Sequence, residues 1–232
     1  MEILHRESPN NRQVTLPCFL LALAAAAACL AWAPLLTAQS ATDSAKVTFT
    51  KVLKGSVPEY LAIGVDASGE ASYQGRKQDD PPSPLPLKLS SATTRRIFQL
   101  AKALKNFDSI DLESHKKVAN LGLKTFIYER EGRQNRAEFN YTQLREAQEL
   151  VDVFEKISSV QQHILALEYA IKYDHLSLPK ELMLIQIDLE KHALADPELM
   201  VPALEKIAHN PRFLHLAQAR AENILQRLQS NN

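Results

Sequence analysis

Residues 124–142 read KTFIYEREGRQNRAEFNYT and hold two runs of alternating apolar and polar residues on either side of Glu131-Gly132. Alternation with a period of two predicts strands with one buried face, and the short turn between them predicts a hairpin. Thr142 then offers an N-cap for a long helix, because apolar residues recur every three or four positions up to about residue 173. A hairpin that leads into a long helix favours an α+β fold over alternating βαβ units.

The residues before this hairpin predict the rest of an antiparallel sheet. Three earlier runs alternate in the same way and predict strands at 47–50, 60–65 and 70–73. Prolines within residues 76–86 predict a loop, and a short edge strand is expected at residues 85–89. Ser90 or Ser91 is a suitable N-cap for the helix that follows.

The C-terminal part of the chain predicts only helices. A proline at each expected helix start marks their boundaries, at Pro179, Asp196-Pro197 and Asn210-Pro211. Connections this short make neighbouring helices antiparallel, as in a small bundle. We therefore expect an α+β fold: an α+β domain over residues 41–158, with a small antiparallel sheet and one or two packed helices, then an α-helical bundle over residues 159–232. The two parts share the long helix of about residues 142–173.

The first residues of the chain predict export. Arg6 and Arg12 precede the apolar run Leu16–Ala38, and small residues follow it. This order is typical of a secretory signal peptide, here over residues 1–40. The run also reaches the roughly 17–25 residues that span a bilayer as a helix, so an uncleaved anchor is the alternative. We expect a periplasmic or secreted protein, or one anchored to the inner membrane by Leu16–Ala38.

Both cysteines of the chain, Cys18 and Cys29, lie in this apolar run. The residues Ala26-Ala27-Ala28-Cys29 loosely resemble a lipoprotein cleavage box. The apolar run continues past Cys29 without a polar tether, however, which argues against lipidation of this cysteine. A mature domain without cysteines has no disulfides and depends on its hydrophobic core for stability.

Charge is balanced over the whole chain, with 27 basic and 27 acidic residues, but its distribution is uneven. Residues 46–140 hold 16 Lys and Arg against 11 Asp and Glu, whereas residues 141–232 hold 9 against 13. Nucleic-acid binding requires a dense basic surface, and here bases alternate with acids among few aromatic residues. We therefore expect no nucleic-acid partner.

Three segments resemble uncharacterised exported bacterial proteins of a domain-of-unknown-function family. They are KVANLGLKTF at 117–126, FNYT at 139–142 and AQELVDVFEKI at 147–157. The resemblance covers roughly residues 46–160 and rests on the order hairpin, Ser-capped helix, hairpin, helix. It implies a fold and a compartment, and it implies no activity, ligand or catalytic residue.

The densest group of polar residues lies between Asp108 and His115, where the sequence reads DSIDLESH. It offers an acid, a hydroxyl and an imidazole, which a hydrolase requires if the fold brings them together with a distant group. An exposed connector rich in turn-forming acids is the simpler interpretation. The sequence also contains no Gly-x-Ser-x-Gly motif.

Metal ligation has one weak candidate pair, Asp188 and His192, which are four residues apart on an expected helix. This spacing places two ligands on one face, but a zinc site requires a third protein ligand, and no His-Glu-x-x-His motif supplies it. We expect no cofactor and no catalytic residue.

These observations favour an exported cell-envelope protein that acts as a non-enzymatic binding or protein-interaction module, with a protein partner in the envelope. Two alternatives remain: a hydrolase that uses the Asp108–His115 connector, and a membrane-tethered structural spacer. A membrane is an expected partner only if the N-terminal segment is not cleaved.

Overall fold

The computed structural model describes residues 45–230. The predicted signal peptide of residues 1–40, the alternative anchor Leu16–Ala38 and both cysteines lie outside the described residues.

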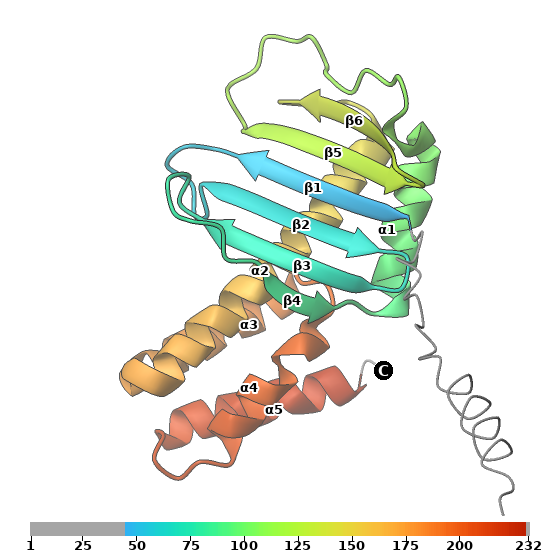
Figure 1. Cartoon of the computed structure of the whole chain (residues 1–232). Helices are drawn as coiled ribbons and strands as arrows, with labels where there is room; N and C mark the ends of the chain where they lie inside the picture. The colour runs from blue at the N-terminus through green and yellow to red at the C-terminus, as the bar shows by residue number, and fades with distance from the viewer. Residues whose placement is uncertain (1–44, 231–232) are drawn as a thin grey trace, which may run out of the picture. The chain divides into compact units, whose positions relative to one another are not determined.

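A six-stranded antiparallel sheet forms the N-terminal half of this region, with the strand order β4-β3-β2-β1-β5-β6 (Figure 1). Its strands are β1 (Lys46–Val52), β2 (Tyr60–Asp66), β3 (Glu70–Arg76), β4 (Leu85–Lys88), β5 (Leu123–Arg130) and β6 (Arg133–Phe139). All neighbouring strands pair antiparallel, and the expected edge strand is β4. The predicted sheet of an α+β fold is confirmed.

Local turn chemistry explains two of the hairpins. Between β5 and β6, Glu131 and Gly132 both have positive φ angles, of 52° and 70°, as a two-residue type I′ turn requires. Between β2 and β3, the Asp66 carboxylate accepts hydrogen bonds from the backbone N–H groups of Ser68 and Glu70, at 2.8 and 3.0 Å. Such Asx interactions stabilise the chain reversal between the two strands.

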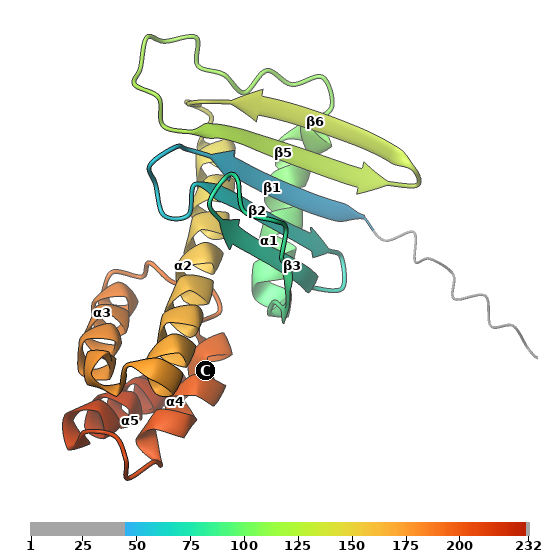
Figure 2. The same ribbon diagram turned by 60° about the vertical axis from the view of Figure 1, so that its left-hand side comes forward.

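Two helices, α1 (Ser91–Ala103) and α2 (Arg145–Tyr173), pack on the same face of the sheet (Figures 1 and 2). Ser90 is the N-cap of α1, as predicted, and its hydroxyl accepts a hydrogen bond from the backbone N–H of Thr93 at 3.1 Å. No described helix covers the opposite face of the sheet.

The start of α2 differs from the prediction that Thr142 caps it. Leu144 is the N-cap, with an extended backbone and no side-chain cap, and the helix begins at Arg145. The Thr142 hydroxyl instead accepts a hydrogen bond from the Leu144 N–H at 3.2 Å, and the Gln148 side chain donates to the Thr142 carbonyl at 2.9 Å. The segment that leads from β6 to α2 therefore uses Thr142 as a turn residue.

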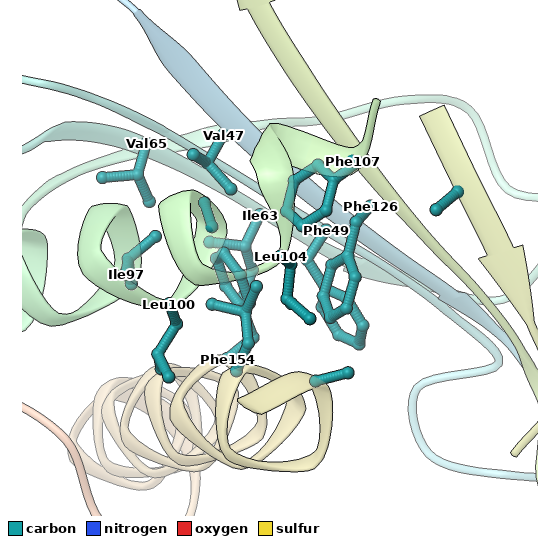
Figure 3. Close-up of a cluster of buried hydrophobic side chains, with 14 of the residues drawn as sticks. Val47, Phe49, Ile63, Val65, Ile97, Leu100, Leu104, Phe107, Phe126 and Phe154 are labelled. Atoms are coloured by element: carbon teal, nitrogen blue, oxygen red, sulfur yellow. The ribbon is translucent and has the colours of Figure 1, made fainter. Parts of the chain in front are cut away.

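Aliphatic and aromatic side chains together fill the space between the sheet and the two helices (Figure 3), and the aromatic ones form a cluster of their own. Five phenylalanines form this cluster, at positions 49, 107, 126, 139 and 154. Phe126 of β5 lies within 5.0 to 6.5 Å, between ring centroids, of the other four rings. These distances are typical of packed aromatic pairs, so Phe126 joins β5 to α2 through Phe154 and to the 3-10 turn after α1 through Phe107.

The predicted C-terminal helices are present as α3 (Leu178–Glu190), α4 (Val201–Ala208) and α5 (His215–Ser230). Single 3-10 turns lie before α3 and α4, and another follows α1, at His175–Ser177, Pro197–Met200 and Lys105–Phe107. The bundle has its own buried cluster, whose members include Leu167, Leu182, Leu204 and Ile224. Along α2 the side chains pass from the first cluster to the second between Ile157 and Val160.

One of the predicted helix starts is wrong. Asn210-Pro211 does not begin the last helix, because Asn210 accepts hydrogen bonds from the backbone N–H groups of Arg212 and Phe213 and holds a turn before α5. At Asp196-Pro197 a helical turn does begin at Pro197, as predicted, but Asp196 makes no side-chain cap: its backbone is left-handed, with φ 55° and ψ 52°, and its carboxylate accepts hydrogen bonds from Ser90 and Thr93 at the start of α1. None of the helices within residues 45–230 has both the length and the apolarity to cross a bilayer.

Candidate functional site

A pocket of about 440 Å³ lies at the end of the sheet where β1 and β6 finish and β5 begins, beside the N-terminal half of α2. We call it the lysine pocket, and its principal lining residues are Lys51, Leu121, Lys124, Phe139, Val151 and Glu155.

Strand register brings the two lysines together. Lys51 of β1 lies directly opposite Lys124 of β5, and Lys124 lies opposite Phe139 of β6. Two positions along their strands, the core residues Phe49 and Phe126 point to the same face, which the helices cover. The pocket is therefore the polar end of a row that is otherwise hydrophobic core.

Lys51 is paired with an acid from α2. Its ammonium group lies 2.7 Å from Oε1 of Glu155, and both side chains remain partly exposed, at 25% and 43%. Because water reaches both groups, this pair contributes little to stability but fixes the position of the lysine.

Lys124 is held differently, by backbone carbonyl groups. The residue is 8% exposed, and its ammonium group donates hydrogen bonds to the carbonyl oxygens of Leu121, Gly122 and Asn140, at 3.2, 3.2 and 2.9 Å. Burial is the main cause that lowers the pKa of Lys124, and the positive charge of Lys51 lowers it further. A negative charge in the pocket would raise the pKa of Lys124.

Most of the surface that lines the pocket is apolar, although several of the lining residues are polar. Leu53, Phe139 and Val151 line the interior, and Leu121, which is 45% exposed, lies at the mouth. The Phe139 ring centroid is 6.0 Å from the Lys124 ammonium, at the outer limit of a cation–π contact. The pocket thus offers positive charge next to apolar surface.

The loop between residues 108 and 122 is attached to the end of β6 and supports the mouth of the pocket. The Asn140 side chain accepts a hydrogen bond from the Leu121 N–H at 2.8 Å and donates to the Ala119 carbonyl at 3.0 Å. Glu113 accepts a hydrogen bond from the Asn140 N–H at 2.6 Å, and this bond is the main cause that lowers the pKa of the Glu113 carboxyl group.

The sequence interpretation missed both pocket lysines. A signal was present, because alternation along 47–51 and 124–128 places Lys51 and Lys124 on the same side as Phe49 and Phe126. A lysine on the apolar face of a predicted strand is unusual, and it indicates a position at the boundary between the hydrophobic core and a polar site.

The Asp108–His115 connector is an irregular loop in the structure; Asp108, Ser109, Asp111 and His115 are exposed, and Leu112 is buried in the core. Nε2 of His115 lies 2.7 Å from the Asp111 carboxylate, with side chains 73% and 66% exposed, and the interaction with Asp111 raises the pKa of His115. The two serines bond elsewhere: Ser109 donates to Asp108 at 3.1 Å, and Ser114 contacts Glu113. The loop therefore combines acid and imidazole without a serine hydrogen-bonded to that imidazole in the described part of the chain.

The structure also separates the weak metal candidates. Helix α3 ends at Glu190, so His192 lies beyond it in a turn, with φ 52°. Asp188 instead lies 2.9 Å from Nε2 of His163, and this pair joins α3 to α2. Within residues 45–230 no three acidic, histidine or cysteine residues are grouped as metal ligands would be.

No protein-family model matches the chain, and neither does any curated protein sequence.

Proposed function

We propose that the protein is an exported, non-enzymatic binding module of the cell envelope that holds a partner protein through the lysine pocket. One observation carries the proposal: a pocket of about 440 Å³ combines apolar walls with two lysine ammonium groups. Apolar pockets with a few convergent polar groups are typical of binding sites. Like charges directly opposite each other in a sheet reduce stability, so a partner that uses them explains their placement.

The contacts of the two lysines favour binding over catalysis. Lys124 donates to three carbonyl groups, and Lys51 is paired with Glu155. These interactions hold both amino groups at fixed positions. Such an arrangement recognises an anionic group, whereas a lysine that acts as a base or nucleophile needs a free amine.

Export rests on the sequence pattern of residues 1–40 alone. Sequencing the N-terminus of the protein from cells tests it. A new terminus near Ser40 supports export with cleavage. An intact N-terminus in the membrane fraction instead supports the membrane-tethered spacer.

Site-specific photocrosslinking in the native cell tests the binding function. A photoreactive amino acid at Leu121, at the mouth of the pocket, is expected to give a discrete crosslinked species. The matched control is the same amino acid at Leu216 of α5, which is 55% exposed and lies in the helical bundle.

The crosslinks at the two positions show whether the partner binds at the pocket, at the bundle or at neither. A discrete crosslink from Leu121 that is absent from Leu216 supports the proposal. Discrete crosslinks from Leu216 alone would move the interaction surface to the bundle and overturn the role of the pocket. Absence of discrete species from both positions would overturn the interaction function itself.

A further inference from the structure

The charges of the lysine pocket are not balanced. Among its described lining residues Glu155 is the one carboxylate, and it lies against Lys51. The Lys124 ammonium donates to three neutral carbonyl oxygens instead. Glu155 and Glu113 both act on the charge of Lys124, but Glu113 lies outside the lining and its carboxylate accepts the hydrogen bond from the Asn140 N–H. The lining itself carries two ammonium groups and one carboxylate, an excess of one positive charge that a ligand anion would offset.

The surface next to this charge is apolar and open. Leu53, Phe139 and Val151 lie inside the pocket, and the exposed Leu121 continues the apolar surface to its mouth. Its volume of about 440 Å³ is at the lower end of the roughly 300–1,000 Å³ of small-ligand sites. The occupant must therefore carry an anion and a compact apolar group side by side.

Two amide side chains add groups that suit a peptide backbone. Asn120 uses its oxygen to accept from the Gly122 N–H, and Gln148 uses its nitrogen to donate to the Thr142 carbonyl. Within the described residues the Asn120 nitrogen and the Gln148 oxygen have no further hydrogen bond. They supply one donor and one acceptor, which are the two groups that a peptide unit pairs with.

We infer that the lysine pocket binds the C-terminal residue of a partner polypeptide, with the terminal carboxylate at Lys124 and Lys51 and an apolar last side chain between Leu53, Phe139 and Val151. A chain terminus carries both groups on one residue, and capture of a terminal carboxylate is a recurring mode of peptide recognition. This inference rests on the proposed function, because it names the part of the partner that the pocket holds.

Titration of the protein with short peptides, followed by NMR of leucine and valine methyl groups, tests the inference. The probes are N-acetyl-Ala-Ala-Leu with a free carboxylate, the same peptide as its C-terminal amide, and 4-methylpentanoate as an acid without a peptide unit. We expect the free acid to shift the methyl signals of Leu53, Leu121 and Val151. The amide should bind about tenfold or more weakly, because it lacks the charge that pairs with Lys124.

Two variants with opposite expected effects separate recognition from folding. Lys124→Met keeps the apolar stem and should lose the preference for the acid. Glu155→Gln frees Lys51 for the ligand and should tighten binding of the acid about twofold to fivefold, a gain that misfolding does not produce. Lys172→Met at the end of α2 is the matched control and should change nothing.

Three results would overturn the inference and leave the proposed function intact: equal binding of acid and amide, binding of 4-methylpentanoate as tight as that of the tripeptide acid, or no peptide binding while Leu121 still crosslinks to a partner. Failure of the crosslink at Leu121 would instead remove the proposed function itself. Acid-selective binding that Lys124→Met abolishes and Glu155→Gln strengthens supports the inference.

Discussion

At the scale of single residues, the pocket shows how a strand position changes its role at the end of a core. Phe49 and Lys51 point to the same face of β1, yet one is fully buried among aromatic rings and the other is a quarter exposed. The exposure of Lys51 is greater because the sheet ends there. At the same end, backbone carbonyls of the 119–122 loop become available to Lys124, which lies opposite Lys51. A long side chain with a charged end suits such a border, since its stem packs while its ammonium group is solvated by carbonyls.

Glu113 gives a residue-scale prediction on pH. Because its folded-state pKa is lowered from the ordinary value of 4.5, mainly by the hydrogen bond from the Asn140 N–H, its carboxylate stabilises the fold at neutral pH. The contribution of this carboxylate to the free energy of unfolding is complete above the unfolded-state pKa. It is lost as the pH falls through the lower folded-state pKa. Glu113→Gln should therefore be less stable than the parent at pH 7, with a difference that shrinks below about pH 4.5.

Urea unfolding of both proteins at a series of pH values measures this difference. Glu222→Gln, an exposed glutamate of α5, is the matched control and should unfold like the parent at each pH. A difference between Glu113→Gln and the parent that stays constant down to pH 3 would show that the carboxylate charge is not the cause.

At the scale of elements, the start of α1 depends on a residue from the helical bundle. The Asp196 carboxylate accepts hydrogen bonds from the N–H and the hydroxyl of Ser90, both at 2.7 Å, and from the hydroxyl of Thr93 at 2.6 Å. A carboxylate at the first turn of a helix also interacts favourably with the helix dipole. Asp196 therefore stabilises α1 and connects it to the segment before α4.

Adjacent threonines at this helix start should respond in opposite ways to the same substitution. Thr94 is 6% exposed, and its hydroxyl has no hydrogen-bond partner in the described region, so Thr94→Val should raise the free energy of unfolding by up to about 1 kcal/mol. Thr93→Val removes the hydrogen bond to Asp196 and should lower the free energy of unfolding by about 1 kcal/mol. Both substitutions keep a β-branched residue, so the helix propensity changes little. Urea unfolding followed by circular dichroism compares the two, and equal effects would contradict the assignment.

Some features of these elements could be predicted from the sequence, and others could not. The strands, the Ser90 cap and the order of the helices could be predicted, because alternation, apolar spacing and capping are local properties. The start of α5 and the role of Asp196 could not, because each depends on contacts with the tertiary structure. The place of each pocket lysine on an apolar strand face was visible in the alternation, but their pairing could not be predicted, because Lys51 and Lys124 are 73 positions apart and only strand register brings them together.

At the scale of the whole described region, one helix supplies both hydrophobic cores. Helix α2 is 29 residues long; its first half packs under the sheet through Phe154 and Ile157, and its second half packs in the bundle through Val160 and Leu167. Residues 45–230 also belong to one compact unit. Helix formation is cooperative between neighbouring turns, and α2 contributes to both cores, so we expect the two cores to lose stability together.

This coupling is tested by a cavity placed in the bundle and read in the sheet. Leu204 of α4 is fully buried, and Leu204→Ala should lower the free energy of unfolding by about 2–5 kcal/mol. If unfolding is cooperative, hydrogen exchange of β1 and β5 should lose as much protection as that of α4. Leu216→Ala, the same exchange at a residue that is 55% exposed, should change protection by less than about 0.5 kcal/mol. Unchanged protection in β1 and β5 of Leu204→Ala would instead mean that the sheet and the bundle unfold separately, and that α2 joins them without coupling their stability.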